Sequence, residues 1–340
     1  MRRRHFVAML GRIGMLAFLP PRRPGRTRRP GHWSAPRIDV HAHVFGPALV
    51  DRMRSLIETP EIRDAITTVE ADPIIGELDR TGVERALLLS TAFVASGCAV
   101  WGRRSPSEEY RDVREENDFT AAQAATAGGR LIPFASVNPR SDYAVEELTR
   151  CIDRLGMRGL AVNFGGNDVR LGESRHLQQV RELCACAADR NIPVVAEIHN
   201  PEVEATEAVE MDRLVSQVIA PLPALHILIA HLGSSGGVDF RAHHSFAALI
   251  AAIERRPAVR RRVWVDCGAV FLAMAFSPPT AASEARLAQL STLLDGWPID
   301  RLLWGSDNIP DALDEARRIW PQGQAAWEAM AASDGSALLA

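Results

Sequence analysis

The stretch LIPFASVNPRSDYAVEELTRCIDRLGMRGLAVN, residues 131–163, decides the fold of this chain. It opens with a short apolar run, continues with apolar residues at helical spacing, and closes with a second apolar run. A strand, a helix and a second strand in this order are typical of a parallel sheet with helical connections. The pattern predicts strands at Leu131–Val137 and Gly159–Asn163, joined by a helix at Asp142–Leu155.

The same alternation extends in both directions from this stretch. Further apolar runs predict strands at Arg37–His41, Arg85–Ser90, Pro193–His199, His226–His231, Arg262–Cys267 and Arg301–Ser306. Further helices are predicted at Asp72–Thr81, Glu108–Ala127, His176–Arg190, Val209–Ile219, Phe246–Arg255, Glu284–Leu294 and Asp311–Ile319. About eight strands, each followed by a helix, over about 300 residues match the size of an α/β protein with a (β/α)8 TIM barrel.

An open, doubly wound sheet is the alternative α/β architecture. Such a sheet usually carries a glycine-rich phosphate-binding turn after its first strand, whereas this chain has HAHVFGPAL at residues 41–49. The barrel is therefore favoured. The long connections Val44–Ala71 and Thr91–Ser107 would lie on its carboxyl-terminal face, where we expect them to form a lid or a substrate pocket.

Composition and charge narrow the range of functions. The chain has 340 residues, 24% charged and 47% hydrophobic, which is typical of a globular protein. Residues 1–34 hold nine arginines and no acidic residue, so the remainder carries 30 arginines against 42 acidic residues, a formal charge of −12. This acidic body argues against a nucleic-acid partner. The sequence contains no lysine, which excludes an amine nucleophile and a carboxylated lysine.

Residues 1–35 are predicted to be a disordered or targeting extension, and residues 36–340 to form a single barrel domain. The five scattered cysteines are typical of reduced core thiols, which favours a cytoplasmic location. Export through a twin-arginine-like segment is the alternative, because Arg2, Arg3 and Arg4 precede a partly apolar stretch. No later segment has the roughly 18 consecutive apolar residues that a membrane span needs, so no membrane partner is expected.

Histidines and one aspartate mark the carboxyl ends of four predicted strands. His41 and His43 end the first strand and, because side chains alternate along a strand, point to the same face. His199, His231 and Asp307 close the fifth, sixth and eighth strands. These strand ends converge at the mouth of a barrel, where imidazole and carboxylate groups from distant positions can share one metal ion.

Several motifs also resemble those of a known family. Four segments are similar to motifs of the metal-dependent amidohydrolase superfamily. They are IDVHAHVF at the first strand, the histidine after PVVAEI, the segment IAHLGSSGG, and LLWGSDNIP at the last strand. VNP at 137–139 and GMRGLAVN at 156–163 resemble its amidohydrolase 2 branch, which includes decarboxylases related to aminocarboxymuconate semialdehyde decarboxylase. The resemblance spans about residues 37–320 and implies a barrel enzyme that acts on a small molecule.

The resemblance also implies roles for individual residues. His41, His43, His199 and Asp307 match the metal ligands, and His231 matches a histidine that assists catalysis beside the metal. Family members with two metals bridge them through a lysine or glutamate at the end of the fourth strand, a place that ends here in Ala161, Val162 and Asn163. We therefore expect one divalent ion, Zn²⁺ with Mn²⁺ as the alternative. A homodimer is expected at the level of the family alone.

The expected chemistry is activation of water. A divalent ion with an open coordination position lowers the pKa of a bound water molecule to about 7 and polarises a carbonyl group. Asp307 would take the proton of that water, and His231 would bind the developing oxyanion or protonate the leaving group. Asp39 and Glu197 each precede an expected ligand by two residues, on the same strand face but one layer deeper, and either orient that ligand or form core hydrogen bonds.

Three residues are candidates for substrate binding. Arg241 follows a glycine-rich loop and could bind a carboxylate, Trp101 could form an aromatic wall, and Asn163 ends the fourth strand. The favoured function is metal-dependent hydrolysis of an amide, lactone or ester in a small, carboxylated metabolite. The alternative, on the same ligands, is non-oxidative decarboxylation of an aromatic or muconate-type acid.

Overall fold

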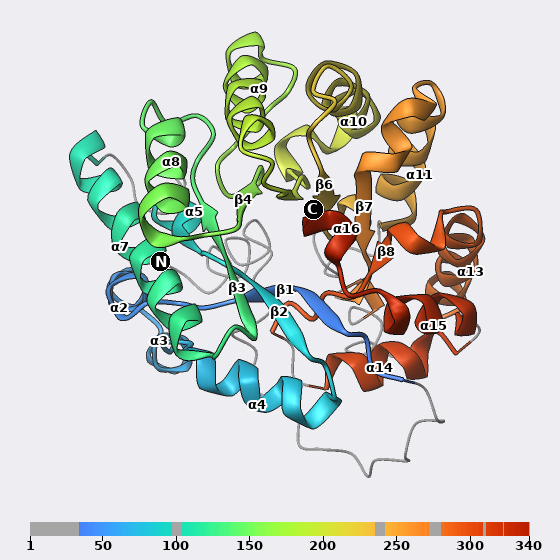
Figure 1. The fold of residues 1–340 in the computed structure, drawn as a ribbon, viewed down its shortest axis with the longest axis horizontal. Helices are drawn as coiled ribbons and strands as arrows, with labels where there is room; N and C mark the ends of the chain where they lie inside the picture. The colour runs from blue at the N-terminus through green and yellow to red at the C-terminus, as the bar shows by residue number, and fades with distance from the viewer. Residues whose placement is uncertain are drawn as a thin grey trace.

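A single sheet of eight parallel strands forms the centre of the molecule. The computed structural model describes residues 34–96, 104–234, 242–268, 270–271, 280–308, 311–321 and 323–339. The strands are β1 (Ile38–His43), β2 (Arg85–Leu89), β3 (Leu131–Ser136), β4 (Gly159–Asn163), β5 (Val194–Glu197), β6 (Ile227–Ile229), β7 (Val263–Asp266) and β8 (Leu302–Leu303). The backbone amide of Val40 donates to the carbonyl oxygen of Trp304 (2.8 Å), which joins the first strand to the last. The predicted (β/α)8 barrel is confirmed (Figure 1).

Helices connect the strands and surround the barrel (Figure 1). In the first half they are α2 (Pro47–Ser55), α3 (Pro60–Ala65), α4 (Ala71–Thr81), α5 (Ala92–Ala95), α7 (Pro106–Thr126), α8 (Ala144–Leu155) and α9 (Ser174–Asp189). In the second half they are η1 (Pro201–Thr206), α10 (Glu207–Arg213), η2 (Leu214–Ile219), η3 (Ala230–Gly233), α11 (Ala242–Glu254), η4 (Pro257–Arg262), α13 (Ala281–Asp295), η5 (Ile299–Arg301), α14 (Ala312–Ile319), α15 (Gln324–Ala332) and α16 (Ser336–Leu339). The long connection predicted after the first strand contains α2 and α3, and α15 and α16 were not predicted.

The start of α7 shows how local sequence fixes a boundary. Ser105 accepts a hydrogen bond from the backbone amide of Glu108, and the Glu108 carboxylate accepts one from the amide of Ser105. This reciprocal cap satisfies donors that the first turn of a helix leaves unpaired. The helix therefore begins at Pro106, two residues before the predicted start.

Alternating strand residues divide the apolar core into two layers. The larger cluster lies between the strands and the helices. The smaller one fills the barrel and includes Val40, Leu89, Phe134, Val195 and Trp264. Leu338 of α16 joins this inner cluster, so the C-terminal helix lies across the end of the barrel at which the strands begin (Figure 1).

A bulge in β1 changes which of its residues face the barrel interior. The pairing of β1 with β2 shifts between Asp39 and Ala42. Ile38 and Val40, before the shift, lie in the inner cluster, whereas Ala42 lies in the outer one. The two histidines that flank Ala42 therefore face the interior. Asp39 does not share their face, so that part of the prediction was wrong.

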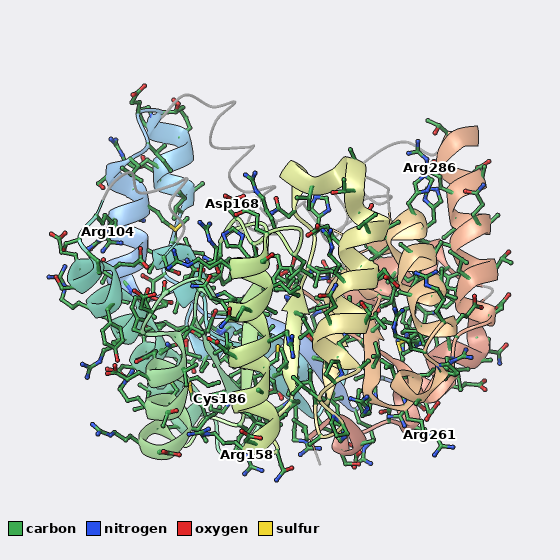
Figure 2. The ribbon with its side chains drawn as sticks, turned by 90° about the horizontal axis from the view of Figure 1, so that it is seen from above. Arg104, Arg158, Asp168, Cys186, Arg261 and Arg286 are labelled. Atoms are coloured by element: carbon green, nitrogen blue, oxygen red, sulfur yellow. The ribbon has the colours of Figure 1, made fainter. Side chains whose placement is uncertain are left out.

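The two ends of the barrel are well separated. Arg158 and Arg261, which precede β4 and β7, lie at one end (Figure 2). Arg104 and Asp168, which follow β2 and β4, lie at the opposite end (Figure 2). The strands of a barrel all point the same way, so the predicted site belongs to the end that carries Arg104 and Asp168.

Two further expectations concern thiols and membranes. Cys151, Cys184, Cys186 and Cys267 are free and buried, as predicted, and Cys98 lies outside the described residues. None of the described helices has the length and apolar character that crossing a membrane requires.

Candidate metal centre

The two histidines of β1 bring their ring nitrogens together at the barrel mouth. His41 and His43 are buried, and their Nε2 atoms lie 3.0 Å apart. His43 Nδ1 lies 3.1 Å from the carbonyl oxygen of Leu89, which can only accept a hydrogen bond. The proton of this ring is therefore on Nδ1, and the lone pair of Nε2 is available to a metal ion.

Asp307 enters the same group from the end of β8. Its backbone has φ 55°, a left-handed conformation that turns the chain out of the strand. Its amide donates to the carbonyl oxygen of His41 (2.8 Å), which fixes the turn against β1. The Asp307 Oδ1 atom lies 3.7 Å from His43 Nε2 and 4.0 Å from His41 Nε2.

His231 follows β6 in a second left-handed turn, with φ 52°. Its ring centroid lies 4.3 Å from that of His41. Asp266, at the end of β7, accepts a hydrogen bond from the His231 amide (2.9 Å). The Asp266 Oδ1 atom lies 3.3 Å from His231 Nδ1, and Oδ2 lies 3.4 Å from His41 Nδ1.

Asp266 was missed in the sequence, although the signal was present. A carboxylate that ends an apolar strand of a barrel reaches the same mouth as the histidines. The strand VWVD carries this signal at residues 263–266, one residue before the predicted strand end at Cys267.

Glu197 also reaches the mouth, from the end of β5. Its Oε1 atom lies 3.9 Å from His41 Nε2, and its Oε2 atom accepts a hydrogen bond from Asn163 Nδ2 (2.8 Å). In the described part of the chain, two sets of ligand atoms lie within 4.8 Å of one another. One consists of His41, His43 and Asp307, and the other of His41, Glu197 and His231.

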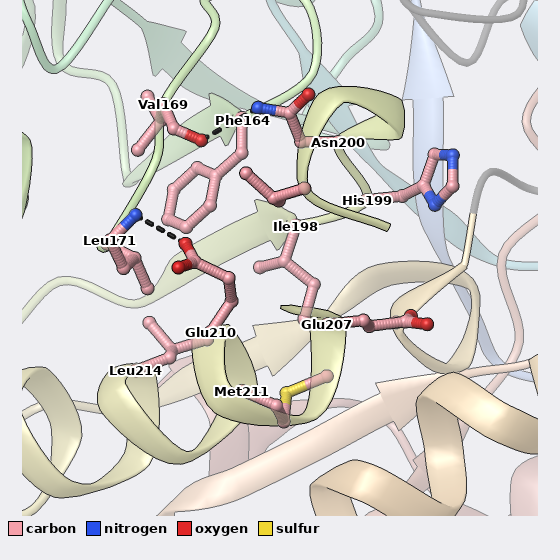
Figure 3. A pocket seen from close by; sticks show the side chains of 12 residues that line it. Phe164, Val169, Leu171, Ile198, His199, Asn200, Glu207, Glu210, Met211 and Leu214 are labelled. Atoms are coloured by element: carbon pink, nitrogen blue, oxygen red, sulfur yellow. Dashed lines mark hydrogen bonds between the residues drawn. The ribbon is translucent and has the colours of Figure 1, made fainter. Parts of the chain in front are cut away.

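The remaining predicted residues are placed differently. His199 is in neither set and lines a neighbouring pocket with Phe164, Ile198 and Met211 (Figure 3). Its imidazole is turned away from these apolar side chains (Figure 3). Asn163 is buried and bonded through both polar atoms, since Oδ1 accepts from the amide of Gly166 (2.7 Å).

Two candidates for substrate binding, Trp101 and Arg241, lie outside the described residues. Asp39, expected to orient a ligand or to form core hydrogen bonds, accepts hydrogen bonds from the backbone amides of His41 (3.0 Å) and Ser306 (2.9 Å). It therefore ties β1 to the segment after β8.

Burial and mutual charge shift the pKa values at the mouth. Burial raises the pKa of Asp307 to about 7, against the opposing effect of His231 and His41. Burial alone would lower the pKa of His41, but the hydrogen bond and charge of Asp266 raise it to about 9. Burial and the neighbouring His41 hold the pKa of His43 well below its usual value.

The donor set fits a divalent metal ion. Imidazole nitrogens and carboxylate oxygens bind Zn²⁺ at about 2.0–2.2 Å, so two ligand atoms on one ion lie at most about 4.4 Å apart. The distances from His41 Nε2 to His43 and Asp307 are 3.0 and 4.0 Å. Asp307 Oδ2 and His231 Nε2 are buried and have no hydrogen-bond partner among the described residues. Such buried polar atoms are costly unless a bound group satisfies them.

Comparison with known proteins supports a common fold. No curated protein matches the chain. A solved 5-carboxyvanillate decarboxylase of Novosphingobium aromaticivorans with bound manganese is 13% identical, with a TM-score of 0.60, over 91% of this chain and 98% of its own. A probable 2-pyrone-4,6-dicarboxylic acid hydrolase of Acinetobacter baumannii with bound citric acid is 16% identical, with a TM-score of 0.54, over 85% of this chain and 94% of its own. An amidohydrolase of Burkholderia multivorans with bound zinc is 15% identical, with a TM-score of 0.55, over 85% of this chain and 91% of its own.

Identities this low show a shared fold and no more. The family assignment comes from the sequence itself, since the amidohydrolase family model matches residues 38–335. This match covers most of the chain, including every strand of the barrel and both sets of ligand atoms. The protein is a member of the amidohydrolase family.

Proposed function

We propose that the protein is a metal-dependent hydrolase that uses an activated water molecule on the amide, lactone or ester carbonyl of a small, carboxylated metabolite. The observation that carries this proposal is the buried group of His41, His43 and Asp307 at the barrel mouth, with His231 packed beside it. Catalytic residues of TIM-barrel enzymes lie at this end of the strands.

His41, His43 and Asp307 would hold the metal ion, together with a ligand from β5. Zn²⁺ suits imidazole and carboxylate ligands, and Mn²⁺ is the alternative. Structural neighbours with bound zinc and with bound manganese are consistent with either ion. When bound, such an ion lowers the pKa of a water molecule and polarises a carbonyl group.

His231 is the acid–base group of this proposal. The contacts of Asp266 with its amide and with Nδ1 leave Nε2 as the ring nitrogen that can face a substrate. From Nε2 the imidazole can donate a hydrogen bond to a developing oxyanion or a proton to a leaving group. Asp307 can accept the proton of the attacking water through Oδ2. Arg241, Trp101 and Asn163 stay the predicted contacts to the substrate.

Non-oxidative decarboxylation is the second candidate. The 5-carboxyvanillate decarboxylase neighbour favours it, because that protein shares the fold over 91% of this chain. In this reaction His231 would protonate the carbon atom that loses carbon dioxide. The same residues would serve both reactions, so the two reactions are distinguished by their products.

The test compares two product signatures in one preparation. Metal-loaded enzyme is offered carboxylated lactones, amides and esters, and beside them aromatic and muconate-type acids, in water enriched in ¹⁸O. Hydrolysis gives a product that carries ¹⁸O, detected by mass spectrometry. Release of carbon dioxide with no ¹⁸O in the product would overturn the hydrolase in favour of the decarboxylase. Absence of both signatures together with absence of bound metal would overturn the proposal itself.

A further inference from the structure

Two consecutive residues of the turn after β8 lie in the left-handed region of the backbone. Asp307 has φ 55° and Asn308 has φ 56°. This region is unfavourable for most residues that carry a side chain, and asparagine is among those that adopt it most readily. Asp307 belongs to the ligand group at the mouth, so the conformation of this turn bears directly on the metal centre.

The Asn308 side chain pairs with both backbone polar groups of His43. The amide of His43 donates to Oδ1 (2.8 Å), and Nδ2 donates to the carbonyl oxygen of His43 (2.5 Å). Because a backbone amide only donates and a carbonyl oxygen only accepts, these partners fix the orientation of the carboxamide. The side chain thus offers a donor and an acceptor side by side, as the backbone of a neighbouring strand would.

This pairing continues the contact between β1 and β8 beyond the end of the shorter strand. β8 comprises only Leu302–Leu303. Further along, the amide of Asp307 donates to the carbonyl oxygen of His41 (2.8 Å), and at His43 the side chain of Asn308 takes the place of a strand backbone. His43 is buried, so its backbone groups would be costly if they were left unpaired.

His43 is thereby held from two sides. Its Nδ1 atom lies 3.1 Å from the carbonyl oxygen of Leu89 in β2, and its backbone is bonded to Asn308 on the side of β8. Its Nε2 atom then lies 3.7 Å from Oδ1 of Asp307. Two ligand atoms on one ion lie at most about 4.4 Å apart, so this spacing suits a shared ion. Asn308 connects the two ligands, since it follows one in the chain and is hydrogen-bonded to the other.

The turn that carries Asn308 is itself tied to β1. The backbone amide of Asn308 donates to Ser306 Oγ (3.3 Å), and the amide of Ser306 donates to Asp39 Oδ1 (2.9 Å). Hydrogen bonds therefore join the turn to β1 at Asp39, at His41 and at His43. Movement of the turn would displace the ligands of both elements.

From this geometry we propose that Asn308 is a positioning residue of the metal centre. It holds His43 and Asp307 within the distance that one ion allows before any metal binds. This inference rests on the proposed metal-dependent function and deepens it. Loss of the two side-chain hydrogen bonds should weaken metal binding even where the fold persists, because binding would then have to bring the ligands together.

The test measures metal binding and requires no substrate. The full chain is stripped of metal with a chelator and titrated with Mn²⁺, and free Mn²⁺ is followed by its electron paramagnetic resonance signal. Asn308→Gly keeps the left-handed backbone accessible and removes both hydrogen bonds. We expect it to weaken Mn²⁺ binding about 10- to 100-fold, the usual effect of losing a group that orients a ligand.

Asn117 of α7 provides a matched control. It makes the same two-point pairing with the backbone of Ser136, donating to the carbonyl oxygen (3.1 Å) and accepting from the amide (3.0 Å). Ser136 ends β3 and belongs to neither set of ligand atoms. Asn117→Ala should therefore lower the melting temperature and leave the affinity for Mn²⁺ as it is in the wild type. Equal weakening of Mn²⁺ binding in Asn117→Ala and Asn308→Gly would overturn the proposal, because a general loss of stability would explain both.

A measurement on the wild-type chain decides the question if Asn308→Gly does not fold. Selective ¹⁵N-histidine labelling limits the amide spectrum to the ten histidines, and His43→Asn identifies the signal of His43. In the metal-free chain this amide should be protected from hydrogen exchange, because it donates to Asn308. Exchange at the rate of an exposed amide would show that the pairing is not formed before metal binds, and would overturn the proposal.

The outcomes separate this inference from the proposed function. If the wild type binds Mn²⁺ and Asn308→Gly binds it equally well, Asn308 has no positioning role and the metal centre stands. If the wild type binds neither Mn²⁺ nor Zn²⁺, the proposed function fails and this inference fails with it.

Discussion

Asp266 holds His231 at two points, accepting a hydrogen bond from its backbone amide at 2.9 Å and lying 3.3 Å from its Nδ1 atom. The second oxygen of the same carboxylate lies 3.4 Å from His41 Nδ1. One carboxylate from β7 thus orients two imidazoles that come from β1 and from the turn after β6. In each ring it favours a proton on Nδ1 and leaves Nε2 free for a metal ion or a substrate.

Replacing Asp266 with Asn should impair both imidazoles. An amide presents one acceptor and one donor, so one of the two rings must face an NH₂ group and adopt the wrong tautomer. We expect kcat/KM to fall about 10- to 100-fold, as is usual for groups that orient metal ligands. Asp212→Asn is the control, because Asp212 pairs with Arg255 and Arg256 away from the barrel mouth. Equal activities of the two variants would contradict the role of Asp266.

His231→Asn should reduce turnover by about 10²- to 10⁴-fold, the usual contribution of an acid–base group. We expect its metal content, measured by plasma mass spectrometry, to equal that of the wild type. His226→Asn is the matched control, because His226 lies just before β6, at the opposite end of the barrel, beside Trp264. Loss of metal from His231→Asn would make His231 a ligand, as its closeness to His41 and Glu197 also permits.

Much of the fold follows from the sequence because strand position depends on local pattern. Gly159–Asn163 was predicted with the bounds that β4 has in the structure. The fifth strand was predicted to end at His199 but ends at Glu197, so His199 lies beyond the strand end from which it was assigned. The pairing of β4 with β5 ends at this point, where the amide of Phe164 donates to the carbonyl oxygen of Glu197 (2.8 Å).

The ligand group is predictable to the extent that it depends on strand ends. His41, His43 and Asp307 were named from the sequence, and the structure brings them together. The bulge in β1 and the orientation of Glu197 by Asn163 depend on pairing between strands. Such contacts join residues far apart in the chain, and no local pattern of a single sequence carries them.

Glu116 should make stability depend on pH. This carboxyl group of α7 accepts hydrogen bonds from the amide of Gly46 and the hydroxyl of Thr91, and burial raises its pKa to about 7. The folded state therefore binds a proton more tightly than the unfolded state, whose carboxyl has a pKa near 4.5. The stabilising contribution is complete below pH 4.5 and is lost as the pH rises toward 7.

Glu116→Gln tests this dependence, because its amide oxygen can accept both hydrogen bonds without a charge. Between about pH 4.5 and 7, the free energy of unfolding of the wild type should fall relative to that of the variant. The slope is at most about 1.4 kcal/mol per pH unit. Urea unfolding of both proteins at several pH values measures the difference between their free energies of unfolding. The other titrating groups contribute equally to both proteins, so their contributions cancel in this difference. Parallel pH profiles of the two proteins would refute the shifted pKa.

Gly268→Ala should prevent β7 and β8 from packing normally. A Cβ atom at this position would lie 1.8 Å from the carbonyl oxygen of Gly305, a backbone atom that cannot rotate away. We expect a large loss of soluble protein or a strongly lowered melting temperature. Gly76→Ala in α4 is the control, because nothing lies within 4 Å of its added Cβ. It should raise stability by about 0.5–1 kcal/mol, as Ala does over Gly within a helix. Similar melting temperatures of the two variants would contradict the close approach at Gly268.

The bulge of β1 makes the catalytic mouth sensitive to the length of this strand more than to the identity of its residues. The extra residue in the bulge determines which face of β1 carries the two imidazoles. Val40 and His41 are neighbours in sequence, yet both face the barrel interior. Deleting one residue here would leave every donor group in the protein and yet turn His41 and His43 toward the surrounding helices. Insertions and deletions in β1 should therefore be excluded among active relatives, even where conservative substitutions at Ala42 are tolerated.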